Sequence, residues 1–240
     1  MSQPDRLTAA PESVPSRRGG ETRTLGECWA AFWKRPSPPI LAGGILVAAA
    51  LRVLAGPLTW RDAVVAVGIA ALTPFAEWAI HVYLLHAKPL RVGHVRLDLP
   101  TAYEHRAHHA APGELDGVLL PVYGVLIFLP MMAVTVWVLS FPVHLVLGGD
   151  RLAGAATGLL VSYLILGAYE WAHFLIHTPY RARGRYYRSI WKNHRLHHYK
   201  NERFWFGVTS TVGDRVIGTN PDQAQVRRSR TARSLHPNPR

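Results

Sequence analysis

Four long apolar stretches set the strongest limit on how this chain of 240 residues can fold. They cover residues 39–55, 62–85, 118–140 and 152–176. Crossing a bilayer takes about 20 residues of helix, and each stretch reaches or nearly reaches that length. The pattern predicts an all-α integral membrane protein with four transmembrane helices.

The charged residues are separated from these apolar stretches. The chain carries 27 Lys and Arg against 15 Asp and Glu, a formal net charge of +12, although 49% of its residues are hydrophobic. Six basic residues precede the first stretch, four lie between the second and third, and 14 follow the fourth. Since Lys and Arg concentrate on the cytoplasmic side, we expect both termini and the middle segment to be cytoplasmic. Basic residues that flank apolar runs argue against a nucleic-acid-binding surface.

The ends of the chain differ in composition from its centre. Residues 1–24 are polar and lack the apolar core of a signal peptide, which predicts a disordered N-terminal tail. Residues 25–36 are amphipathic, as in a helix at a membrane surface. The basic residues 220–240 predict a disordered tail near anionic lipid, which leaves residues 25–219 as one membrane domain. The single cysteine, Cys28, excludes an intrachain disulfide and a thiolate metal site.

Ten of the 13 histidines fall into two groups of five with the same internal order. Each group begins with a pair four or five positions apart and continues with a His-x-x-His-His pattern. On an α-helix, positions i, i+3 and i+4 share one face, so each set presents its imidazoles in one direction. The first group is His81, His86, His105, His108 and His109, and the second is His173, His177, His194, His197 and His198.

The predicted topology brings both groups to the same side of the membrane, in a cytoplasmic cap of short helices. Imidazole is the usual protein ligand of iron, zinc and copper, and ten imidazoles can hold two ions with positions left for oxygen or water. Because His86 follows His81 by five residues, about 140° around a helix, we expect His86 at the helix end. We expect this cap, with Phe204, Trp205 and Phe206 turned back toward the lipid, to roof the metal site.

Two carboxylates precede the first histidines of the second and fourth membrane helices. Glu77 lies four residues before His81, and Glu170 lies three before His173. A carboxylate inside a membrane is costly without a partner, which makes both residues functional candidates. We expect each to accept an N–H from a ligating histidine and so to fix the tautomer of that ring. Direct metal ligation is the alternative.

A histidine-rich dimetal site at a membrane surface suits oxygen activation by iron. Hydroxylation of a C–H bond needs a strong oxidant, which amino-acid side chains alone do not provide. Imidazole suits zinc as well, so the sequence leaves open which metal the isolated protein holds.

The histidine boxes carry a family resemblance that covers about residues 74–219. The strings HVYLLH, HRAHH, HFLIH and HRLHH, together with HHYKNERFWFGVTSTVGDRVIGT, resemble the fatty acid hydroxylase branch of the membrane fatty acid hydroxylase and sterol desaturase superfamily, and particularly fatty acid 2-hydroxylases. The resemblance implies that all ten histidines are metal ligands. It also implies oxygen-dependent 2-hydroxylation of a fatty acyl chain, free or in a lipid.

Eukaryotic members of this branch often carry a fused cytochrome domain. The residues before the first predicted span are too few for such a domain, so we expect a separate electron-transfer protein. A sterol or carotenoid hydroxylase or desaturase of the same superfamily is the alternative enzyme, and a non-catalytic membrane metal-binding protein is the alternative class. Reductant-driven oxygen uptake would separate the classes, and product mass would separate the substrates.

Overall fold

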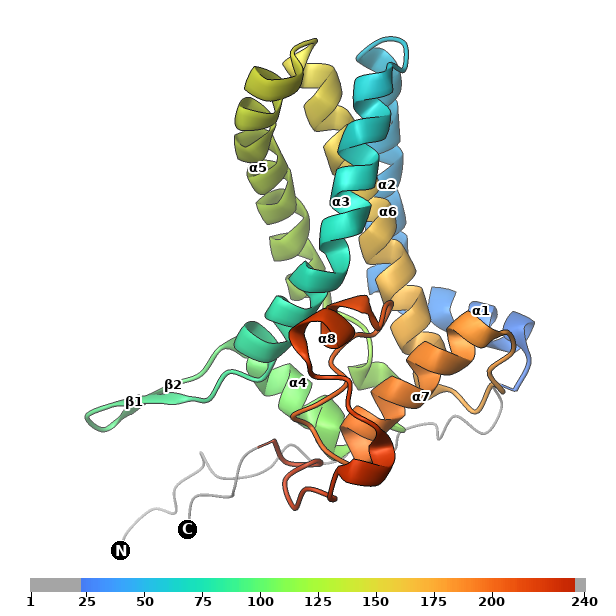
Figure 1. Ribbon diagram of the computed structural model, residues 1–240, viewed down its shortest axis with the longest axis vertical. Coiled ribbons are helices and arrows are strands. Elements are labelled where there is room, and N and C mark those ends of the chain that lie inside the picture. Colours follow the sequence, from blue (N-terminus) through green and yellow to red (C-terminus); the bar gives the residue numbers. More distant parts are fainter. Residues whose placement is uncertain (1–22, 236–240) are drawn as a thin grey trace, which may run out of the picture.

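The computed structural model describes residues 23–235, so nearly all of the predicted N-terminal tail lies outside the described residues. Four long helices form a bundle that makes up the elongated part of the molecule (Figure 1). Each is long and apolar enough to cross a membrane, which confirms the prediction of four helices suited to be membrane spans. They are α2 (Ser37–Leu54), α3 (Trp60–Ala79) with its π-helical continuation η1 (Ile80–Leu85), α5 (Val122–Leu147) and α6 (Arg151–His177).

Helix α6 packs against α2, α3 and α5 and so forms the centre of the bundle. Glycines allow close approach: a Cβ at Gly167 would lie 3.3 Å from a side-chain atom of Ile45, and one at Gly44 would lie 3.0 Å from Leu129. Small residues serve the same purpose in other membrane helix pairs, because dispersion contacts replace the hydrophobic effect inside lipid. Tyr163 of α6 adds a hydrogen bond to the backbone oxygen of Leu129, at 2.6 Å.

Helix α5 is longer than the apolar pattern suggested, since it continues past Ser140 to Leu147. Pro142 lies inside it, and proline is tolerated in membrane helices when nearby polar groups satisfy the freed backbone. In the turn before this proline, the Ser140 hydroxyl donates to Trp137 O at 2.7 Å, and the Arg151 guanidinium donates to the same oxygen at 2.9 Å.

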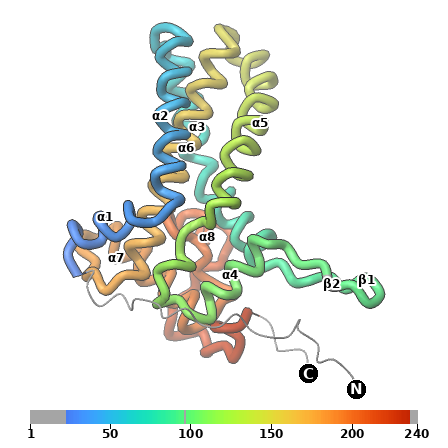
Figure 2. The backbone as a smooth tube through the Cα atoms, turned by 180° about the vertical axis from the view of Figure 1, so that it is seen from behind, coloured from blue at the N-terminus to red at the C-terminus, as the bar shows by residue number. Residues whose placement is uncertain are grey.

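The shorter helices gather at one end of the bundle and form a cap (Figures 1 and 2). Helix α4 begins at Pro100, where a missing N–H has no consequence. Phe32 of α1 packs with residues that precede α5 and with Phe174 of α6, and so ties α1 to the bundle. The cap consists of α1 (Leu25–Trp33), α4 (Pro100–Ala110), η2 (Leu115–Gly117), α7 (Arg185–Tyr199), α8 (Val212–Ile217) and η3 (Gln223–Gln225).

A small hairpin departs from the expected all-α fold. Strands β1 (Leu90–Val92) and β2 (Val95–Leu97) pair in antiparallel fashion, with Leu90 opposite Leu97, and the hairpin projects away from the cap (Figure 1). Gly93 at its turn has a φ of +61°, a conformation that two-residue hairpin turns need and glycine adopts readily. The rest of the described chain is helical or irregular, as predicted.

The expectation of a disordered segment from residue 220 differs from the structure, which folds residues 220–235 onto the cap. Ser229 N donates to Lys200 O at 2.8 Å, and the Ser229 hydroxyl donates to the Glu202 carboxylate at 3.0 Å. The Trp205 indole donates to Pro221 O at 3.2 Å. Composition alone predicted disorder because the segment is polar, but besides its internal turns the segment makes these hydrogen bonds to the cap.

Candidate metal centre

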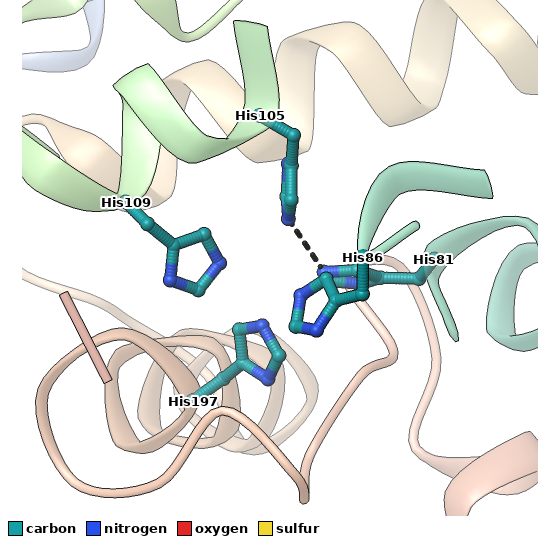
Figure 3. A group of neighbouring side chains, drawn as sticks. All are labelled: His81, His86, His105, His109 and His197. Atoms are coloured by element: carbon teal, nitrogen blue, oxygen red, sulfur yellow. Dashed lines mark hydrogen bonds between the residues drawn. The ribbon is translucent and has the colours of Figure 1, made fainter. Parts of the chain in front are cut away.

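All ten histidines of the two predicted groups come together inside the cap, as two adjoining clusters. In each cluster, the ligand atoms of five histidines lie within 4.8 Å of one another. The rings of His109 and His198, one from each cluster, are 4.1 Å apart between centroids. The first cluster, shown in Figure 3, is His81, His86, His105, His109 and His197, and the second is His108, His173, His177, His194 and His198.

The clusters correct the partition that sequence order suggested, because His108 and His197 have exchanged places. The His108 ring lies 4.4 Å from that of His177, and the His197 ring lies 4.6 Å from that of His81. The reason is helical phase. Residues i and i+4 are only about 40° apart around a helix, whereas residue i+3 lies about 60° to the other side of i. Helices α4 and α7 therefore each contribute an i, i+4 pair to one cluster and the intervening histidine to the other.

The five-residue spacing of His81 and His86 is accommodated by η1. Its wider turn is closed by a hydrogen bond from His86 N to His81 O, at 3.0 Å, which is the i to i+5 pattern of a π-helix. The two rings consequently lie 4.9 Å apart, on the same side of the chain. The predicted position of His86 at the helix end is confirmed, since His86 follows the last residue of η1.

Backbone carbonyls orient four of the rings. The Nδ1 atom of His81 lies 2.6 Å from Phe206 O, and that of His197 lies 2.8 Å from Phe204 O. The corresponding distances are 2.9 Å from His109 to Ala232 O and 2.7 Å from His177 to Pro112 O. A carbonyl can only accept, so each Nδ1 carries the proton and each Nε2 keeps its lone pair. Metal-ligating histidines are held in this way.

The inward nitrogens fit a metal ion. Within the described residues, the buried Nε2 atoms of His109, His173 and His197 have no hydrogen-bond partner, which is costly unless an ion binds them. Other Nε2 atoms face each other, as in His81 and His105 at 3.0 Å (Figure 3) and His177 and His194 at 3.0 Å. Two ligands held at about 2.1 Å from one ion and at right angles are about 3.0 Å apart.

Burial keeps the cap histidines neutral. It holds the pKa values of His105, His194 and His198 well below the usual range, and the neighbouring imidazoles lower them further. The pKa of His109 falls to about 3, mainly through burial. A neutral imidazole is the form that binds metal, so the cap supplies ligands without a protonation cost near neutral pH.

A turn at Trp205 joins two of the orienting carbonyls. Trp205 has a φ of 59°, in the left-handed region that bulky side chains rarely occupy. Its neighbours Phe204 and Phe206 supply the oxygens that accept from His197 and His81. Trp205 and Phe206 are buried, and the Phe206 ring lies 5.4 Å from that of His81. The expectation that these two aromatic side chains turn toward lipid is therefore wrong, because they fill the interior of the cap.

The two carboxylates contact backbone amides and not the histidine rings, within the part of the chain that the structure describes. Glu77 accepts from Val208 N and from the Thr209 amide and hydroxyl, the latter two at 2.8 and 2.7 Å. Glu170 accepts from Leu120 N at 2.9 Å. Neither makes the direct hydrogen bond to a histidine that we expected, because both side chains satisfy loops that would otherwise have unpaired N–H groups.

Sequence reasoning missed the orienting groups because they are main-chain atoms. Pro112, Phe204, Phe206 and Ala232 contribute only their carbonyl oxygens, so their side chains carry no sign of the role. The one signal in the sequence was position: the loops that directly follow the histidine-bearing helices α4 and α7 supply three of the four carbonyls.

Two neighbouring cavities reach the clusters. An apolar cavity of about 360 Å³ lies between α3, α5 and α6 and extends to His81. A smaller cavity of about 70 Å³ is lined by His105 of the first cluster and by His108 and His173 of the second. Leu85, Leu120 and Tyr169 line both cavities, so the two cavities are neighbours, and together their walls include histidines of both clusters.

Four helices suited to crossing a membrane and two five-histidine clusters in a cap are the features of a multi-pass membrane protein with a site suited to metal ions. A family model of fatty acid hydroxylases matches residues 65–219, and the chain belongs to this family. Fatty acid 2-hydroxylase of Rattus norvegicus is 31% identical over 145 residues, which are 60% of this chain and 36% of the relative. The ceramide very long chain fatty acid hydroxylase scs7 of Schizosaccharomyces pombe is 28% identical over 144 residues, which are 60% of this chain and 38% of the relative. The matched segment thus spans little more than a third of these relatives.

A solved structure described as full-length scs7p, with only the hydroxylase domain visible, resembles this fold. The TM-score is 0.56 at 21% sequence identity, and the match covers 87% of this chain and 70% of that one. At this identity the likeness supports the arrangement of helices, while the chemistry has to be argued from the site.

Proposed function

We propose that this protein is a membrane-bound dimetal oxygenase that hydroxylates a lipid acyl chain at carbon 2, using dioxygen and an external electron donor. The observation that carries the proposal is the apolar cavity that runs between membrane helices and ends at the histidine clusters. An apolar cavity in a helical bundle suits a long apolar ligand, and the clusters at its end suit redox-active metal ions. Iron, when bound, supplies the activation of dioxygen that side chains cannot provide.

The chain's own residues bind and position the substrate in this proposal. Leu72, Phe128, Met131 and Leu166 line the apolar cavity and would bury the acyl chain away from water. The smaller cavity, with Glu104, Tyr169 and Glu170 among its lining residues, would receive the polar end of the lipid. Carbon 2 is next to that polar end, and it would therefore lie closest to the histidines.

The ten histidines are the residues we assign to the two metal ions, five to each cluster. Glu77 and Glu170 are positioning residues in this scheme. Glu77 holds the loop whose Phe206 oxygen accepts from His81, and Glu170 holds Leu120, which lines both cavities. Each carboxylate holds a loop by its main-chain N–H groups and, within the described residues, makes no hydrogen bond to a ligand ring itself.

The similarity to a fatty acid 2-hydroxylase and to a ceramide very long chain fatty acid hydroxylase favours 2-hydroxylation of a fatty acid or ceramide over a sterol or carotenoid reaction. A crevice between three helices also suits a single flexible chain better than a fused ring system. We place the metal centre and both termini on the cytoplasmic side, because 24 of the 27 Lys and Arg residues flank the membrane segments on that side in the predicted topology. A separate cytoplasmic or membrane-bound electron-transfer protein would supply the electrons.

Lipid analysis in a host that lacks 2-hydroxylated lipids tests the proposal. Expression of the intact chain should yield 2-hydroxylated acyl chains by mass spectrometry, and the purified protein should contain about two metal ions. The His197→Ala variant should lose the product and part of the metal, because one cluster loses a ligand. Protein with both ions bound, a working electron donor and no hydroxylated lipid would leave a non-catalytic metal-binding protein as the better description.

A further inference from the structure

A second cavity of about 360 Å³ lies at the other end of the same three-helix crevice. Like the cavity that reaches His81, it is lined by α3, α5 and α6, but by the halves of these helices that lie farther from the cap. Ile69 is the residue that lines both cavities. The crevice therefore continues from the histidine clusters toward the opposite end of the bundle, with Ile69 at the division.

Three helices meet at this division. A Cβ at Gly158 of α6 would lie 3.5 Å from Cδ1 of Ile69 on α3 and 3.0 Å from Cγ1 of Val136 on α5. Both side chains thus pack against the bare backbone of Gly158, where no larger residue would fit without displacing them. The constriction consists of aliphatic groups, and its width depends on the side chain at position 69.

The outer cavity suits an apolar occupant. The charged side chains at its rim have partners within the protein: Arg61 donates to Leu147 O at 2.8 Å, and Arg151 donates to the Ser140 hydroxyl at 3.0 Å. Asp62 forms an ion pair with Arg52, with an N···O distance of 3.1 Å. These charges are satisfied without a ligand, and Val136 and Leu139 face the interior of the cavity.

The position of the constriction matches the length of one membrane leaflet. Ile69 precedes His81 by 81 − 69 = 12 residues, or about 18 Å of helix. Half of the hydrocarbon core of a bilayer is about 15 Å thick. An acyl chain of ordinary membrane length that starts at the histidine clusters would therefore end near Ile69, and a longer chain would have to pass it.

We propose that Ile69 determines which acyl-chain lengths this protein accepts, because it closes the passage to the outer cavity. The inference rests on the proposed function, since it takes the inner cavity to hold the substrate chain. Shortening the side chain at position 69 joins the two cavities and lets longer chains bury their methyl ends. Enlarging it shortens the inner cavity.

Two substitutions at Ile69 should shift the product profile in opposite directions. Membranes containing the protein would receive an equimolar series of acyl chains, and the hydroxylated products would be quantified by mass spectrometry. For Ile69→Ala, the ratio of longer to leaflet-length products should rise about fourfold for each methylene that enters the outer cavity. For Ile69→Phe, the profile should move to shorter chains. Ile127→Ala is the matched control, because Ile127 lies on α5, is 60% exposed and lines neither cavity.

A binding measurement separates this inference from the proposed reaction. Long acyl chains that carry a terminal diazirine would be photolysed with each variant, and the labelled peptides identified. Ile69→Ala should show more label than the unchanged chain in residues 136–147, the part of α5 that contributes to the lining of the outer cavity, whatever its turnover. Equal labelling of the two proteins, or a product profile for Ile69→Ala that matches that of Ile127→Ala, would overturn the role of Ile69. Absence of any hydroxylated product with labelling as expected would instead count against the reaction alone.

Discussion

At the scale of single residues, the exchange of His108 and His197 matters most. Each is the middle histidine of a His-x-x-His-His set. The other two histidines of that set belong to one cluster, and the middle one belongs to the other cluster. Loss of either residue should therefore affect a different ion from the one that sequence order assigns. The remaining eight histidines stay in the groups that sequence order suggests.

Paired substitutions can test this assignment by metal content. The His108→Ala/His173→Ala variant damages one cluster only and should keep about one ion per chain. The His81→Ala/His108→Ala variant damages both clusters and should keep almost none. Elemental analysis of the purified proteins, with circular dichroism to check the helical content, provides the measurement. The opposite result for the two pairs would restore the partition by sequence order.

At the scale of elements, residues 226–235 form a C-terminal strap across the first cluster. Ala232 O accepts from His109, and the Arg233 guanidinium donates to His109 O and to Ala110 O, at the end of α4. Thr231 and Ser229 bond to the Glu202 carboxylate, which anchors the strap beside α7. The strap lies beyond residue 219, where the family match ends.

Removal of the strap should weaken one metal site selectively. Truncation after Gln225 leaves the His109 Nδ1 without its carbonyl, and loss of such a partner lowers metal affinity about 10- to 100-fold. Metal competition titrations should show this loss for one ion and little change for the other. Arg228→Gln is the control, because it removes a positive charge from an exposed position of the strap and keeps the strap itself. Equal weakening of both ions would point to general unfolding of the cap.

The elements show where sequence reasoning succeeds and where it stops. Apolar length was enough to predict four membrane helices, and spacing was enough to predict ten clustered histidines. The π-helical turn before His86 has no signature in composition. The strap was predicted to be disordered because its stabilising partners, such as Glu202, lie on other segments. The Glu77 and Glu170 carboxylates were recognised, but their partners are backbone amides whose positions only the fold sets.

At the scale of the whole molecule, the cap whose helices α4 and α7 contribute to both histidine clusters lies at one end of the helical bundle, and the loop between α2 and α3 lies at the other (Figure 1). Both clusters therefore lie on the same side of the membrane, whichever side the cap occupies. Cys28 is the only cysteine and is fully buried, so the unchanged chain offers a low background for thiol labelling.

Introduced cysteines can therefore report the orientation. Leu58, in the loop between α2 and α3, is 76% exposed, and Arg188 lies on the exposed side of α7. With a cytoplasmic cap, a membrane-impermeant maleimide should label Leu58→Cys in intact cells and Arg188→Cys only after permeabilisation. The Cys28→Ser background is the control for residual labelling. Labelling of Arg188→Cys from outside would place the cap on the other side of the membrane.

The left-handed backbone at Trp205 gives the protein a built-in reporter of metal occupancy. A bulky residue in that conformation costs roughly 1–3 kcal/mol, which the surrounding contacts must offset. Two of those contacts are the carbonyl bonds to His81 and His197, and bound metal would rigidify both rings. Metal removal should therefore speed amide hydrogen exchange at Trp205, Phe206 and Gly207 before it affects the membrane helices. Mass spectrometry of exchange in metal-loaded and metal-stripped protein measures this difference. The rate at which the loop around Trp205 opens would then report whether the metal centre is occupied, although this loop contributes no ligand.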